Sequence, residues 1–242
     1  MIDGHAHLNE IPDADGAVLR AKAAGIQAVI AVGMDVRSNL ATLEIARRHP
    51  GVVYPAVGIH PWSIDSGRIE EEIAFVRENL PSCIALGEVG LDYGAKVKKK
   101  IQWSVFERLL ALAAQMKKPA IIHSRYSYER TFAMAREAAV ERAVFHWYSG
   151  PVEILKKILD AGYSVSATPA LATSPQHRAA MELAPLDRIL VETDAPVEYG
   201  GKASEPADLG LTIRELAGIK RKSTEEVAQV TEQNTRSLYA IL

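Results

Sequence analysis

Short apolar runs alternate with longer amphipathic stretches along the whole chain. The runs are four to six residues long and rich in Val, Ile and Ala. Runs of this kind predict strands that are buried on both faces, as in a parallel sheet. We expect strands at Met1–His5, Gln27–Val32, Val52–Val57, Ile84–Gly87, Pro119–His123, Ala143–His146, Tyr163–Ser166 and Ile189–Glu192.

The intervening stretches carry apolar residues at helical spacing. Ser38 is a candidate N-cap for one of them, and Gly25 and Gly162 follow two others as stop signals. We expect helices at Asp13–Ala24, Ser38–Arg48, Ile69–Asn79, Lys99–Met116, Glu129–Ala139, Val152–Ala161, Pro175–Leu183, Ala207–Ala217 and Thr224–Leu242.

Eight strands that alternate with eight or more helices predict an α/β fold, the (β/α)8 TIM barrel. A doubly wound sheet more often uses fewer strands, and no Gly-rich phosphate loop follows the first strand. No linker divides the sequence, so we expect one TIM-barrel domain over residues 1–242.

Composition and charge narrow the function classes. The 48% hydrophobic content is enough to bury a large core, and the formal net charge of −2 argues against binding nucleic acid through bulk positive charge. Cys83 is the only cysteine, which excludes an intramolecular disulfide, and we interpret it as a packing residue. No signal peptide or membrane-spanning stretch is visible, so we expect a cytoplasmic protein without membrane association. No protein partner is inferred.

Polar residues follow the predicted strands at their carboxyl ends. In a closed barrel these ends form one face, where barrel enzymes build their active sites. Packing explains such a set poorly, because polar groups near a core are costly unless they are paired. The residues are His5, His7, His60, Glu88, His123, His146 and Asp194. The two remaining histidines, His49 and His177, are expected at the surface.

Imidazole and carboxylate donors without a thiolate suit Zn²⁺, Mn²⁺ or hydrated Mg²⁺. Six protein ligands exceed the need of one catalytic ion, so we expect two divalent metal ions with Glu88 as the bridge. One ion would take His5, His7 and Asp194, and the other His123 and His146. Asp194 can also accept a proton from the attacking water. Asp3 and Glu192 are expected to hydrogen-bond to ligand histidines.

Several other side chains belong to the same face. Arg125 can bind a substrate phosphate or form a loop salt bridge. The aromatic residues of the face can stack on unpaired bases or pack as the upper rim of the barrel. They are Trp62, Tyr93, Trp147 and Tyr148.

Six motifs, in order along nearly the whole chain, resemble the TatD-type metal-dependent deoxyribonucleases, which are amidohydrolase-like metal barrels. They are Asp3-Gly-His5-Ala-His7, Val57-Gly-Ile-His60-Pro, Gly87-Glu88-Val-Gly-Leu-Asp92-Tyr93, Ile122-His123-Ser-Arg125, Phe145-His146 with Ser149-Gly150, and Glu192-Thr-Asp194-Ala-Pro196. The stretch Val197–Ser204 and the pair Trp147-Tyr148 depart from the family pattern.

The resemblance implies a barrel that hydrolyses DNA phosphodiester bonds with divalent cations. It implies ligand roles for the six residues assigned above and a contact between His60 and the scissile phosphate. We therefore expect an exonuclease-type enzyme that acts on single-stranded or frayed DNA ends, with Asp194, Glu88 and His60 as catalytic residues and His60 and Arg125 as substrate-binding residues. The alternatives are a metal-dependent hydrolase of a small ester, lactone or amide, and a metal-binding barrel without turnover.

Overall fold

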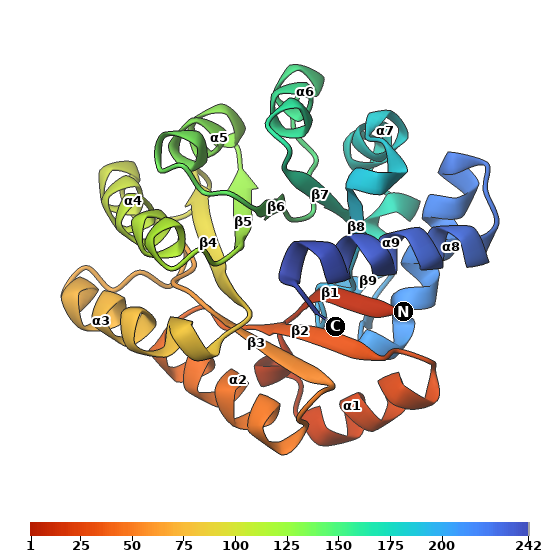
Figure 1. Cartoon of the computed structure of the whole chain (residues 1–242), viewed down its shortest axis with the longest axis horizontal. Coiled ribbons are helices and arrows are strands. Elements are labelled where there is room, and N and C mark those ends of the chain that lie inside the picture. Colours follow the sequence, from red (N-terminus) through yellow and green to blue (C-terminus); the bar gives the residue numbers. More distant parts are fainter. Residues whose placement is uncertain (242) are drawn as a thin grey trace.

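The computed structural model describes residues 1–241 and forms a closed barrel of eight parallel strands, surrounded by helices (Figure 1). The strands pair in chain order, so the barrel fold predicted from the alternating pattern is confirmed. Their bounds are β1 Ile2–Ala6, β2 Ala28–Val32, β3 Val53–Val57, β4 Ala85–Asp92, β5 Ala120–Arg125, β6 Ala143–Phe145, β7 Ser164–Ala167 and β8 Ile189–Val191.

The helices cover the outside of the barrel and, with α9, one of its ends (Figure 1). They are α1 Ala14–Ala23, α2 Val36–Arg48, α3 Ile69–Asn79, α4 Lys99–Gln115, α5 Tyr128–Glu137, α6 Val152–Asp160, α7 Pro175–Leu183, α8 Leu209–Lys220 and α9 Thr224–Tyr239. Short 3-10 helices lie at Leu8–Glu10, Leu80–Ser82, Pro169–Ala172, Leu186–Arg188 and Pro206–Asp208. An antiparallel hairpin, β9 Glu198–Tyr199 and β10 Lys202–Ala203, follows β8.

Several predicted boundaries differ from the observed ones by one or more residues. The last helix was expected to extend to Leu242, which lies outside the described residues. Two of the differences have a clear structural cause. Strand β4 was expected to end at Gly87, but it continues to Asp92 and therefore contains Glu88. Ser38 was expected to cap its helix, but the N-cap is Asp35, whose carboxylate accepts a hydrogen bond from the Ser38 backbone N–H. Ser38 is the third residue after this N-cap, and its hydroxyl accepts a hydrogen bond from the Asp35 backbone N–H. This reciprocal pair satisfies two backbone donors that a single cap would leave free.

The strands sort their side chains into two layers with a period of two. Ile30 and Val32 point into the barrel, whereas Val29 and Ala31 pack between the barrel and its helices. The barrel interior is closed at its amino-terminal end by Leu238 and Tyr239 of α9, residues from the last turn of that helix. Figure 1 shows α9 crossing this end of the barrel. The packed interior leaves only the opposite end for a site.

The barrel closes where β1 meets the segment after β8. The His7 N–H donates to the Ala195 carbonyl at 2.7 Å, and the Asp194 N–H donates to the His5 carbonyl at 3.0 Å. The buried Asp3 carboxylate adds two hydrogen bonds from Thr193, at 3.0 Å from the N–H and 2.6 Å from the hydroxyl. These bonds bind the ends of the two strands together, because each joins residues from opposite ends of the chain.

Cys83 is buried in the core, as its packing role predicts, and burial raises the pKa of its thiol to about 11. Across residues 1–241, no helix is long and apolar enough to cross a membrane.

The prediction for His177 was wrong. Its side chain is fully buried instead of lying at the surface. The Nδ1–H donates to the Tyr148 carbonyl at 2.8 Å, and Nε2 accepts a hydrogen bond from the Thr168 N–H at 3.1 Å. The ring thus connects α7 to two loops that follow strands, and these two bonds require its neutral form. Burial accordingly lowers the pKa of His177 to about 4.

Because the pKa of His177 is lower in the folded protein than in the unfolded chain, acid favours the unfolded chain. The contribution of His177 to the unfolding free energy is full above its ordinary pKa and is lost as the pH falls toward 4. His177 alone should therefore cost about 2 kcal/mol of unfolding free energy between pH 7 and pH 5. Urea unfolding at both values tests this, with His177→Gln as the comparison, since glutamine hydrogen-bonds without titrating. Identical losses in the two proteins would contradict this role of His177.

Candidate metal centre and active site

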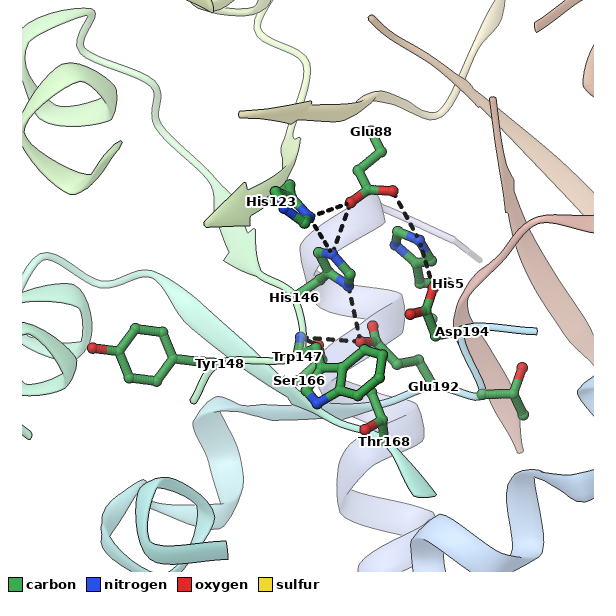
Figure 2. A network of polar contacts seen from close by, with 12 residues as sticks. His5, Glu88, His123, His146, Trp147, Tyr148, Ser166, Thr168, Glu192 and Asp194 are labelled. Atoms are coloured by element: carbon green, nitrogen blue, oxygen red, sulfur yellow. Dashed lines mark hydrogen bonds and ion pairs between the residues drawn. The ribbon is translucent and has the colours of Figure 1, made fainter. Parts of the chain in front are cut away.

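The residues predicted to bind metal gather at the carboxyl end of the barrel, although their strands are spread along the whole chain (Figure 2). A cavity of about 660 Å³ opens above them. Its lining includes His7, His60, Glu88, His123, His146 and Asp194, and His5 is fully buried beside them.

The first group of donors surrounds one oxygen of Glu88. His5 Nε2 lies 3.3 Å from His7 Nε2, 3.4 Å from Glu88 Oε2 and 3.3 Å from Asp194 Oδ1. His7 Nε2 lies 3.3 Å and 3.6 Å from the same two oxygens. Thus two histidines of β1 and its end, one carboxylate of β4 and one after β8 converge on one point.

The second group surrounds the other oxygen of the same carboxylate. Glu88 Oε1 lies 2.8 Å from His146 Nε2, 3.0 Å from His123 Nδ1 and 3.4 Å from His60 Nε2. His146 Nε2 and His123 Nδ1 are 3.4 Å apart. Figure 2 shows Glu88 between the groups, with one oxygen directed to each.

These spacings fit divalent metal ions. A tetrahedral ion with bonds of about 2.1 Å separates its ligand atoms by about 3.4 Å. The five separations that involve His5 or His7 in the first group are 3.3–3.6 Å, close to this value. The nitrogen and oxygen donors suit zinc, manganese or magnesium. The buried histidine and carboxylate clusters are therefore suitable for metal ions.

The electrostatics of the cluster favour positive charge at its centre. Burial alone would lower the pKa of His7, His123 and His146, but the neighbouring carboxylates raise all three above the ordinary value. Burial alone would raise the pKa of Glu88, yet the imidazoles, His146 foremost, hold it well below its usual range. Cations that replace these protons would keep the same charge balance, and binding would release protons.

Asp194 differs from Glu88 in its environment. Burial raises the pKa of its carboxyl group, and the nearby histidines offset only part of this effect. Its backbone also takes the left-handed conformation, with φ at 53°. A non-glycine residue rarely adopts this conformation unless its surroundings enforce it, and such residues concentrate at functional sites.

Buried carboxylates outside the groups orient the histidine rings. Glu192 Oε1 lies 3.3 Å from His146 Nδ1, as the sequence predicts. Asp92 Oδ2 lies 3.2 Å from His123 Nε2, the nitrogen that points away from Glu88. Such partners fix the ring position and the tautomer of a metal-binding histidine. Asp3 accepts hydrogen bonds from the His5 backbone N–H at 3.3 Å and from Thr193, so it contacts a predicted ligand histidine as expected but does not orient its ring.

Asp92 is the site residue that our sequence reasoning missed as a functional group. Besides His123, its Oδ2 accepts a hydrogen bond from Trp62 Nε1 at 2.6 Å. Its backbone exchanges two 2.8 Å bonds with the buried Gln102 side chain of α4. A usable signal was present, because Asp92 is four residues after Glu88 and alternate strand residues share a face. It was overlooked because the strand was expected to end at Gly87.

His60 has a defined tautomer in this arrangement. The Trp62 N–H donates to His60 Nδ1 at 3.2 Å, so the proton resides on Nε2, which faces Glu88 and the cavity. Burial lowers the pKa of His60 to about 4. The ring is therefore a neutral hydrogen-bond donor near pH 7.

The other residues singled out in the sequence differ in their burial and in their distance from the donor groups. Arg125 lines the cavity and is half exposed, with Nε 3.7 Å from Asp92 Oδ1. Tyr148 is fully buried and donates to the Pro151 carbonyl, which makes it a packing residue. Trp62 is 55% exposed at the cavity rim, and Trp147 lies against Tyr199. His49 pairs with Asp15 far from the site.

Comparison with known proteins agrees with this geometry. The family model for TatD-related DNases matches residues 2–240. The chain is 33% identical over 266 residues to the metal-dependent hydrolase TatD of Mycobacterium tuberculosis, covering 100% of this chain and 98% of that protein. It is 28% identical to deoxyribonuclease TATDN3 of Homo sapiens, covering 99% and 94% of the two chains.

A solved structure shows the same fold. The crystal structure of the TatD homologue YjjV from Escherichia coli superimposes with a TM-score of 0.91 at 23% sequence identity. The match covers 100% of this chain and 98% of that one.

Loss of the Asp92 charge should weaken metal binding, because His123 would lose the partner that orients its ring. Removing such a partner typically costs about 10–100-fold in metal affinity. Titration of Asp92→Asn with Zn²⁺ against a chromogenic chelator should show this loss. Asp15→Asn, which removes the carboxylate partner of a histidine outside the site, is the matched control. Wild-type affinity in Asp92→Asn would refute the orienting role.

Proposed function

Since this chain belongs to the TatD family of metal-dependent hydrolases, we propose that it is a deoxyribonuclease that cleaves DNA phosphodiester bonds. The main support for this proposal is the Glu88 carboxylate, whose two oxygens each face a separate group of imidazole donors at the floor of an open cavity. In a two-metal site, adjacent cations with a shared ligand stabilise both the attacking oxygen and the leaving oxygen of a displacement at phosphorus.

The ligand roles follow from the two groups. His5, His7 and Asp194 would hold one ion, His123 and His146 would hold the other, and Glu88 would bridge them. When bound, divalent ions would polarise a phosphoryl oxygen and lower the pKa of a water molecule. A single metal ion fits the site less well, because the two groups of histidines face different oxygens of Glu88 and one ion would bind only one of the groups.

Asp194 is the proposed general base. It lines the cavity and belongs to the first donor group, so a proton leaving the attacking water has an acceptor within reach. The raised pKa of its carboxyl group matches this task better than that of Glu88, which stays ionised.

His60 and Arg125 are the proposed substrate contacts. The His60 Nε2–H can donate to a non-bridging oxygen of the scissile phosphate without carrying charge. Arg125 offers a planar guanidinium that matches phosphate oxygens, and Asp92 holds it at the cavity wall. Because the net charge is −2, these local groups and the ions must supply the attraction for DNA.

We further propose exonuclease action on single-stranded or frayed ends. The donor groups lie at the floor of the cavity, where a strand end can enter more easily than an intact duplex. The aromatic rim at Trp62 offers a surface for an unpaired base. The cytoplasmic location remains a prediction.

Cleavage of end-labelled single-stranded DNA with Mg²⁺, Mn²⁺ or Zn²⁺ tests the proposal. We expect metal-dependent shortening that Glu88→Ala and Asp194→Ala abolish and that Glu71→Ala, a change at an exposed carboxylate of α3, leaves unaltered. No cleavage with any of these metals, in protein that metal analysis shows to be loaded, would contradict it. That result would favour hydrolysis of a small ester, lactone or amide.

His60→Ala separates substrate binding from metal binding. Removing one donor to a developing negative charge typically lowers kcat by about 10²–10³. We expect a loss of this size with unchanged metal content, and no loss in His49→Ala, which removes a histidine outside the site. Loss of one bound ion in His60→Ala would instead identify His60 as a ligand.

A further inference from the structure

Tyr126 is an unusual residue on the loop between β5 and α5. Its side chain is 69% exposed, and its backbone is left-handed with φ at 57°. A bulky residue in this conformation is rare, and water-exposed aromatic rings contribute little to the core. The position therefore costs conformational energy that packing does not return. Such strain in a loop beside a candidate site points to a role in binding.

Tyr126 stands between two hollows of the surface. On one side it lines the cavity above the donor groups, three residues after His123. On the other side it lines a second, more open groove of about 800 Å³. We call this the tyrosine groove and define it by Tyr93, Tyr126, Tyr128, Arg130, Pro151 and Lys157. Tyr128 lines both hollows as well, so the cavity and the groove adjoin along these two residues.

The groove lies over neighbouring elements of the barrel rim. Its walls are the first turns of α5 and α6, which lie side by side (Figure 1), together with Tyr93 after β4. Tyr93 follows β4, which contains Glu88, and α5 follows β5, which contains His123. Helix α6 comes after β6 and His146, the residue that follows this strand. A chain leaving the donor groups can therefore pass over Tyr126 into the groove.

Arg125 is held at the entrance of this path. Its guanidinium lies 5.3 Å from the Tyr126 ring and is anchored by the buried Asp92 carboxylate. The guanidinium therefore lies beside the ring, on the cavity side of Tyr126.

The charges along the groove are mixed, and two of its lining residues, Tyr93 and Arg130, each form a cation–π pair with a residue outside the groove. The Lys99 ammonium lies 4.1 Å from the Tyr93 ring, and the Arg130 guanidinium 5.3 Å from Trp103. Glu129 and Glu153 also line the groove, and Glu129 lies 3.4 Å from the Lys157 ammonium. Rings next to cations are the features that bind single-stranded nucleic acid, where bases stack and phosphates meet positive charge.

We propose that Tyr126 stacks on the base next to the scissile phosphodiester, and that the tyrosine groove holds the following nucleotides of the same strand. The proposal rests on the nuclease function above and names the form of its substrate: a single strand several nucleotides long. Stacking on an exposed ring needs a base that is free of its partner, so a paired duplex cannot use this position.

Binding of a fluorescein-labelled phosphorothioate dT12, which resists hydrolysis, tests the proposal on the metal-loaded protein. We expect Tyr126→Ala to weaken the affinity about tenfold, the size expected for losing one stacked base. Tyr126→Phe keeps the ring and should bind within about twofold of wild type, since stacking does not need the hydroxyl. Leu19→Ala, a change at an equally exposed apolar residue on α1, is the matched control.

The length and strandedness of the DNA give two further readouts. Competition with dT2, dT4 and dT8 should show wild-type affinity rising with length, and this rise should be smaller in Arg130→Ala. A dT12·dA12 duplex should bind equally to wild type and Tyr126→Ala.

Equal affinity of wild type and Tyr126→Ala for dT12 would overturn the proposal, as would an equal loss for duplex and single strand or no binding of dT12 at all. The cleavage assay with Glu88→Ala reports on the nuclease function separately. Metal-dependent cleavage together with an unaffected Tyr126→Ala would leave that function standing and remove only the groove.

Discussion

One buried carboxylate determines the arrangement of the site. Glu88 is 2% exposed, and an unpaired charge at that depth would be strongly destabilising. Five imidazoles, from four other strands and the segments that follow them, lie within 3.4 Å of its two oxygens. The carboxylate and the histidines therefore require one another. Because the oxygens face opposite groups, the same residue that balances the charge also divides the donors into two centres.

The barrel supports this constraint through its closure. His5 and His7 belong to the first strand, and Asp194 follows the last, so the first donor group exists only where the chain ends meet. The Asp3–Thr193 hydrogen bonds and the backbone bonds from His7 and Asp194 fix that junction within the site itself. Burial at this junction raises the pKa of the Asp3 carboxyl group to about 8. Closure of the barrel therefore also brings the donors of the first group together.

Much of this was accessible from the sequence. Apolar runs ending in His, Glu or Asp predict both the strands and the face on which those side chains meet, because parallel strands align their carboxyl ends. Three features were not predicted from the sequence, each for a physical reason. Glu88 and Gly90 interrupt the apolar residues in the second half of β4, so the continuous apolar run ends at Gly87 and Asp92 was not assigned. His177 shares a helix face with Ala180 and Met181, but a polar ring adds no apolar signal to that face, so His177 was misplaced. Asp3 bonds to Thr193, a residue 190 positions away.

The proposed bridging of two metal ions by Glu88 can be tested by anomalous scattering from crystals of the protein grown with Mn²⁺ or Zn²⁺. We expect two peaks, one on each side of the Glu88 carboxylate, with His5, His7 and Asp194 around the first and His123 and His146 around the second. A single peak bound by only one of the groups, at saturating metal, would contradict it.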